Sequence, residues 1–251
     1  MKFINDSPLK YLAFILPALG AFIMLVLIPG LQWAVDYKVI PVEYHAYITG
    51  TVMVILSWIG KKIYQPALHT SPLGFVTVTA GHSNKDPGAV RGKDKEADFV
   101  VKVRNAVELY LLRAGLTVKT DGKGGINLPL TNAIQIIRGS STAIEFHLNA
   151  SVNPQANGVE TISLPKDKAL AQKISKAIAG VTGSRLRGNN GWIDQSQSAR
   201  GKLGFVSNGG LVVELGFISN DSEFAILQAK YWLVAKAIAD VIIEHEKGLK
   251  S

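Results

Sequence analysis

The stretch Phe75–His82, which reads FVTVTAGH, decides the fold of this 251-residue chain. Its β-branched residues, bounded by Gly74 and Gly81, are typical of a buried strand. The next segment, Glu96–Arg113, carries its apolar residues at helical spacing and stops before Gly115. A buried strand followed by such a helix is the unit from which α/β domains are built.

The same alternation continues to the end of the chain. Further strands are predicted at 117–120, 143–148, 158–164 and 210–214, and further helices at 129–138, 168–179 and 230–246. The side chains expected to face inward from the last helix are Trp232, Leu233, Ala237 and Ile238. This pattern predicts an α/β fold in which a mostly parallel twisted sheet is flanked by helices on both faces.

The chain before this domain is far more apolar. No charged residue occurs from Tyr11 to Val35, and about 20 such residues in a helix are long enough to cross a bilayer. A second uncharged stretch is followed at once by Lys61 and Lys62. We therefore expect a two-helix transmembrane hairpin, with helices at about 11–31 and 44–60 in a membrane region over 1–63. A linker containing two prolines at 64–73 and a soluble domain over 74–251 would follow.

The first apolar segment has two other interpretations. A buried core helix is usually shorter and amphipathic, and a cleavable signal peptide usually ends at a pair of small residues, which does not follow Ile28. Lysines flank the outer ends of the two segments, whereas the loop between them carries only Lys38. The positive-inside rule therefore favours a multi-pass protein of the inner (cytoplasmic) membrane with its soluble domain in the cytoplasm. If only the first segment spans, the domain is periplasmic.

The composition limits the chemistry and the partners. Cysteine is absent, which excludes a thiolate nucleophile, a disulfide framework and a cysteine-ligated metal. The net charge is +8, which favours a polyanionic partner such as nucleic acid, anionic lipid or an acidic cell wall. No nucleic-acid-binding motif accompanies the charge, so we expect no nucleic-acid partner.

Acid–base and metal-binding side chains follow the predicted strands. His82 follows the first strand, His147 lies near the end of 143–148, Glu214 ends the strand at 210–214, and Glu96 opens the first helix. Two histidines and one carboxylate form a standard catalytic zinc set, and a second carboxylate would accept a proton from the bound water. Glu96 and Glu214 could divide these two tasks. A hydrogen-bonded structural histidine, or a Glu96 that only complements the helix dipole, is the alternative interpretation.

Four sequence blocks resemble one enzyme family, in order along the chain. Gly81–Ala89 resembles the Gly-His-Gly-Gly-x-Asp-Pro-Gly-Ala opening of zinc-dependent N-acetylmuramoyl-L-alanine amidases, which include bacterial cell-wall amidases and phage endolysins. The segment from Phe146 to Ala150 resembles the family's Ser-Ile-His-x-Asn-Ala block, and Gly158–Thr161 its Gly-x-Glu-Thr strand. Leu211–Asn220, LVVELGFISN, is similar to the family's most recognisable string.

The resemblance implies a role for each matching residue. His82, Glu96 and His147 would bind one Zn²⁺ per chain, and Glu214 would be the catalytic carboxylate. Weaker candidates for contacts with the glycan or peptide are Asn149, Asn190 and Trp192, of which Trp192 could equally belong to the core. Three departures concern substrate contacts and not the metal. Ser83-Asn84 replaces Gly-Gly, 119–122 lacks the family's arginine, and a different pair of residues precedes His147.

Together these features predict an enzyme that hydrolyses the amide bond between N-acetylmuramic acid and L-alanine in peptidoglycan. An amidase held on the cytoplasmic side of a membrane suits a phage endolysin, with the lipid bilayer and possibly a holin as lysis partners. The alternatives are a membrane-anchored bacterial amidase that remodels the wall and a holin-like hairpin with the amidase as its fused partner. A catalytically dead wall-binding module would be expected to lose a ligand or Glu214, and all four residues are present.

Overall fold

The computed structural model describes residues 28–41, 43–44, 47–48, 51 and 74–249. The chain divides into two units, Met1–His69 and Thr70–Ser251. In the first unit, helix α2 spans Ile28–Asp36. Within α2, Gln32 Nε2 donates to Asp36 Oδ1 at 2.9 Å.

Most of the predicted membrane region lies outside the described residues. The described end of the 11–31 segment, Ile28–Leu31, belongs to α2, which continues to Asp36. The 44–60 segment is described at only four positions, and the 64–73 linker lies wholly outside the described residues. Among the helices that are described, none combines the length and the apolar character needed to span a bilayer.

The second unit is built on a six-stranded sheet with the order β4-β1-β5-β8-β6-β7. These strands span Phe75–Ala80 (β1), Val118–Thr120 (β4), Ser140–Asn149 (β5), Glu160–Ser163 (β6), Trp192–Asp194 (β7) and Leu211–Phe217 (β8). β1, β4, β5 and β8 run parallel, whereas β6 pairs antiparallel with β8 and carries β7 parallel to itself. The mostly parallel sheet is therefore confirmed, with its direction reversed at β6.

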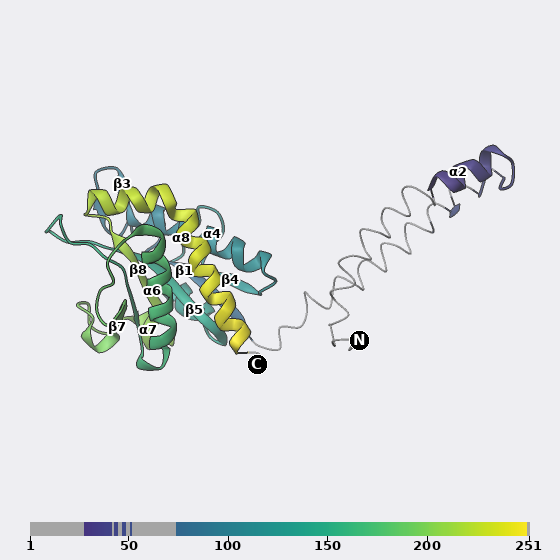
Figure 1. Ribbon diagram of the computed structural model, residues 1–251. Coiled ribbons are helices and arrows are strands. Elements are labelled where there is room, and N and C mark those ends of the chain that lie inside the picture. The colour runs from purple at the N-terminus through teal and green to yellow at the C-terminus, as the bar shows by residue number, and fades with distance from the viewer. Residues whose placement is uncertain (1–27, 42, 45–46, 49–50, 52–73, 250–251) are drawn as a thin grey trace, which may run out of the picture. The chain divides into compact units, whose positions relative to one another are not determined.

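Alternation along the strands gives the sheet two different faces. On one face, Val78, Phe146 and Val213 pack in the main core beneath α4 (Glu96–Arg113), α6 (Lys168–Thr182) and α8 (Asp221–Gly248). Helices α6 and α8 run side by side there (Figure 1). On the other face, Ala143 and Val212 pack in a smaller core with the short helices α5 (Leu130–Ile136) and α7 (Gly204–Ser207). The helices thus flank both faces as predicted.

Helix α8 differs from its predicted form. It begins at Asp221 and not at residue 230, because the Asn220 side chain accepts from the Glu223 backbone N–H at 3.0 Å and caps the helix. Trp232 and Leu233 were expected inward, but their exposed fractions are 50% and 37%. The buried stripe is instead Val234, Ala235, Ile238, Ala239 and Ile242. The prediction is confirmed for Ile238 and wrong for Trp232 and Leu233.

Six short elements were not predicted from the sequence. A hairpin of β2 (Val90–Arg91) and β3 (Asp94–Lys95) precedes α4. The others are β7, α7 and two 3₁₀ turns at Pro165–Asp167 and Gln195–Gln197. Elements of two to four residues are too short to display a hydrophobic period.

Candidate active site

Three side chains of the metal-binding kind meet where the parallel strands end. His82 follows β1, Glu96 is the first residue of α4, and His147 lies near the end of β5. One ligand atom from each lies within 4.8 Å of the others. Glu96 Oε1 stands between the two rings, 2.9 Å from His82 Nε2 and 3.0 Å from His147 Nδ1. The structure therefore brings together the three residues that the sequence proposed as ligands.

Two glycines allow the rings to approach the backbone this closely. A Cβ atom at Gly81 would overlap the imidazole of His147. A Cβ atom at Gly88, which has a φ of +66°, would lie 2.5 Å from His82 Nε2 and 2.7 Å from Glu96 Oε2. His82 itself has a φ of 69°, a left-handed conformation that is uncommon for a non-glycine residue and is often found at functional sites.

Polar contacts hold the loop between β1 and β2. The Ser83 hydroxyl accepts from the backbone N–H groups of Lys85 and Asp86, at 3.2 and 3.1 Å. Asn84 accepts from the Asn127 backbone N–H at 2.7 Å, and Asp86 Oδ2 lies 3.0 Å from His82 Nδ1. The two residues that replace the Gly-Gly pair are thus the ones that fasten the loop. A carboxylate on the second nitrogen of a metal-binding histidine is a common supporting contact.

The electrostatics of the cluster keep Glu96 ionised. Burial raises the pKa of this carboxyl, but the close approach of the His147 and His82 rings outweighs burial and holds the pKa well below its usual range. The backbone N–H groups of Ala89 and Leu148 also donate to it, each at 2.9 Å. Burial lowers the pKa of His147, yet hydrogen bonds to Glu145 and Glu96 prevail and raise it to about 10. The carboxylates of the site therefore favour a positive charge beside them.

Glu214 is a further buried carboxylate, and it lies beside this cluster. It stands opposite His147 in the register of β5 and β8, and its exposed fraction is 4%. Its Oε2 atom has no hydrogen-bond partner among the described residues. Burial raises the pKa of Glu214 to about 7, although the charge of His147 opposes the shift. A carboxyl with a pKa near neutrality can accept and return a proton during catalysis.

A hollow of about 650 Å³ opens over these groups, on the face that carries α5 and α7. His82, His147 and Glu214 line it together with two carboxylates that we did not single out from the sequence, Glu145 and Glu160. Arg187 Nε donates to Glu160 at 2.5 Å, and Arg200 also lines the hollow. Leu130, Leu203 and Phe205 supply an apolar side.

Comparison with known proteins agrees with this geometry. A sequence model of the N-acetylmuramoyl-L-alanine amidases matches residues 76–244. The chain belongs to this family. The predicted membership of the amidase family is thereby confirmed, and the chain is an enzyme that acts on peptidoglycan. No curated protein sequence matches the amidase.

Solved structures with the same fold include other amidases. A protein from Neisseria meningitidis assigned as an N-acetylmuramoyl-L-alanine amidase is 46% identical, with a TM-score of 0.65. The match covers 68% of this chain and 95% of that one. The catalytic domain of CwlV, the amidase from Bacillus (Paenibacillus) polymyxa var. colistinus, is 26% identical with a TM-score of 0.60, over 69% of this chain and 98% of that one. The catalytic domain of an endolysin targeting Clostridia difficile is 18% identical with a TM-score of 0.55, over 68% and 97%. At that identity it shares the fold alone.

The donor atoms of the amidase fit a zinc ion. His82 Nε2 is buried and, within the described part of the chain, makes no hydrogen bond, although Glu96 Oε1 is only 2.9 Å away. The two atoms are therefore close but not aligned for a hydrogen bond, as neighbouring ligands of one ion would be. Two imidazole nitrogens and one carboxylate oxygen are the donors that catalytic zinc takes, with a further position left for water.

Of the three residues of the amidase that we predicted to contact substrate, one lines the hollow and two do not. Asn149 lines the hollow and donates to Glu160 at 3.0 Å. Asn190 and Trp192 do not line it, and the Trp192 indole packs against the main core and donates to Ser163 Oγ at 2.9 Å. Contact of Asn149, Asn190 and Trp192 with the substrate stays a prediction. Glu145 and Glu160 could have been recognised in the sequence, because an acidic residue is unusual in a buried strand. Arg187 and Arg200 lie in loops, where a charged residue is ordinary and indicates no site.

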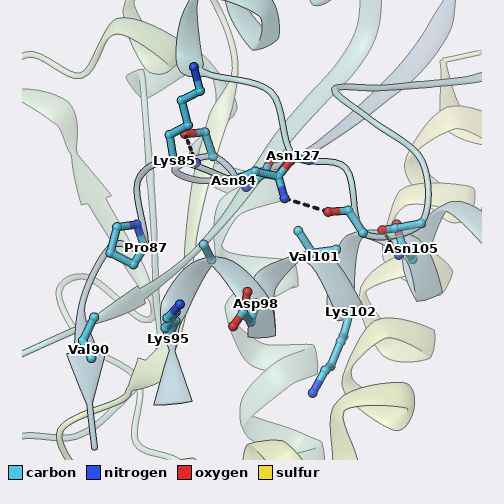
Figure 2. Close-up of a pocket in the computed structure, with 14 residues that line it drawn as sticks. Asn84, Lys85, Pro87, Val90, Lys95, Asp98, Val101, Lys102, Asn105 and Asn127 are labelled. Carbon is cyan, nitrogen blue, oxygen red and sulfur yellow. Dashed lines mark hydrogen bonds between the residues drawn. The ribbon is translucent and has the colours of Figure 1, made fainter. Parts of the chain in front are cut away.

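A second hollow of about 510 Å³ lies on the far side of the His82 loop, and Ser83 lines both. Figure 2 shows Lys95, Asp98 and Lys102 along its lower rim in that view. Asn105 and Asn127 also line it, but their amide N–H groups donate to Gly124 and Gly81, at 2.7 and 2.8 Å. None of the described residues lining this hollow is a histidine, whereas His82, His147 and Glu214 all line the first hollow.

Proposed function

We propose that the chain hydrolyses the amide bond between N-acetylmuramic acid and L-alanine with one Zn²⁺ held by His82, Glu96 and His147. The observation that carries the proposal is the buried, unpartnered Oε2 of Glu214 beside this donor set, as seen in the described residues. Zinc in such a site supplies an acidified water and polarises the carbonyl under attack.

Glu214 does the proton transfer in this proposal. Its free carboxylate oxygen accepts the proton from the attacking water and then returns it to the nitrogen of the leaving L-alanine. Its burial suits both steps, because a pKa of about 7 leaves it ionised in part near neutral pH and able to donate afterwards. In this proposal Asn149 and Arg187, which both hydrogen-bond Glu160 in the same hollow, would contact the substrate.

Two measurements on the full chain test the chemistry. Metal analysis should find one zinc per chain, and digestion of purified peptidoglycan should expose new N-terminal alanine without new reducing sugars. A protein without zinc, or a digest that releases reducing sugars alone, would contradict the proposal.

We also propose that the enzyme is a membrane-associated phage endolysin that reaches its wall only after the membrane is breached. Support comes from the sequence, where two uncharged apolar stretches are flanked at their outer ends by lysines. A reporter that is active only in the periplasm, fused after Ser251, should stay silent in intact cells. A strong signal would favour the alternative, a bacterial amidase with a periplasmic domain, and would leave the chemistry unaffected. Membrane leakage caused by residues 1–70 expressed alone would instead support a holin-like hairpin.

A further inference from the structure

We propose that Glu145 is a positioning residue that holds His147 with its proton on Nε2, which leaves Nδ1 free to bind the metal. The proposal rests on the zinc role proposed above for His147. Glu145 Oε2 lies 3.2 Å from His147 Nε2, and the other ring nitrogen, Nδ1, lies 3.0 Å from Glu96 Oε1. The two nitrogens thus face two different carboxylates.

A neutral imidazole carries one proton, and its position decides which nitrogen can be a ligand. Nδ1 faces the group that also contacts His82, so the metal would bind on that side. An acceptor on the opposite nitrogen stabilises the matching tautomer and makes the ligand more basic. Among the described residues, the acceptor placed at Nε2 is Glu145.

The backbone around Glu145 makes it a rigid support. Glu145 precedes His147 by two residues on β5, so the two side chains share one face of the strand. β5 is an inner strand between β1 and β8, and the Glu145 side chain is 5% exposed. A contact built on a central strand holds its geometry more closely than one built on a loop.

The same contacts separate the role of Glu145 from that of Glu214. Glu145 uses one carboxylate oxygen on His147, whereas Glu214 Oε2 is without a partner in the described residues. The other titratable and charged groups that line the hollow are His82, Asp86, Glu160, Arg187 and Arg200. In the block that resembles Ser-Ile-His, Glu145 stands in place of the serine. Glutamate reaches further than serine and carries a charge, which suits it to the contact seen with His147 Nε2.

The test compares zinc binding by the full chain and its variants, with dissociation constants measured by competition against a chromophoric chelator. Glu145→Ala should weaken zinc binding about 10- to 100-fold, the usual cost of losing such a supporting contact. Glu145→Gln keeps an acceptor at Nε2 and should stay within a few-fold of the parent. Glu160→Gln is the matched control, because Glu160 is a buried carboxylate of the same hollow with no contact to His147 among the described residues, and zinc affinity should not change.

Nitrogen NMR of the zinc-loaded parent gives an independent readout, and His147 should carry its proton on Nε2. Thermal melting shows whether each variant folds, and Glu145→Ser replaces Glu145→Ala if the latter does not. Zinc affinity that is unchanged in a folded Glu145→Ala or Glu145→Ser variant would overturn this inference alone. A proton on Nδ1 would do the same. A parent chain that binds no zinc would overturn the proposed function as well.

Discussion

At the scale of single residues, the site gives two neighbouring glutamates different surroundings. Glu96 is surrounded by donors and stays ionised, whereas Oε2 of the buried Glu214 has no hydrogen-bond partner in the described part of the chain. Environment, and not residue type, would thus suit these two glutamates to the different tasks proposed above.

The first prediction separates the two roles by substitution. Glu214→Gln keeps the size of the side chain and removes the base, so kcat should fall about 10²- to 10⁴-fold while zinc stays bound. His147→Ala should instead lose the zinc. Turnover on purified peptidoglycan and metal content would be measured together. Near-normal turnover by Glu214→Gln would show that another group is the base.

The second prediction concerns pH. Protonated Glu214 cannot accept a proton, so kcat/KM should fall as the pH drops below the pKa of this group. Burial raises that pKa to about 7, and a positive ion beside it lowers it, so the acidic limb should have its midpoint at or below about pH 7. The residual activity of Glu214→Gln should lack this limb. A flat profile between pH 5 and 8 in the parent would contradict the assignment.

At the scale of elements, the start of α8 ties the ends of two strands together. Glu223 is buried and accepts from the backbone N–H groups of Phe217, at the end of β8, and Gly158, just before β6, each at 2.8 Å. The Ser184 hydroxyl donates to it at 2.7 Å. These strands carry Glu214 and Glu160, so this one carboxylate helps to set their relative position.

The third prediction follows from these contacts. Glu223→Ala leaves two buried N–H groups without an acceptor and should lower the free energy of unfolding by about 3 kcal/mol. Urea denaturation of the full chain measures the change. Ser222→Ala, at an exposed neighbouring position, is the control and should differ from the parent by less than about 0.5 kcal/mol. A loss of less than about 1 kcal/mol in Glu223→Ala would show that water replaces these contacts.

At the scale of the whole molecule, the residues proposed for the chemistry all belong to one compact unit. Thr70–Ser251 forms this unit, and it contains the complete sheet and both cores. The match to the structure from Neisseria meningitidis covers 95% of that chain and 68% of this one, so nearly all of that solved chain corresponds to about two thirds of this protein.

The fourth prediction is that residues 74–251 fold alone and hydrolyse purified peptidoglycan at a rate within a few-fold of the full chain. Every group assigned to the chemistry lies in this part. Loss of turbidity of a wall suspension measures the rate, and circular dichroism establishes folding. A folded but inactive fragment would show that the N-terminal region contributes to the reaction itself.

The sequence by itself determined the strand Phe75–Ala80, the helix Glu96–Arg113 and the order of the catalytic blocks, because these depend on local periodicity and short spacings. It could not determine the reversal at β6 or the exposure of Trp232, since both depend on which distant segments meet. Likewise, His82, Glu96 and His147 were recognisable from residue type, but the contact of Glu145 with His147 Nε2 was not. Only the tertiary structure decided which nitrogen faces which carboxylate, because that choice is made by side-chain rotation within packed strands and not by spacing along the chain.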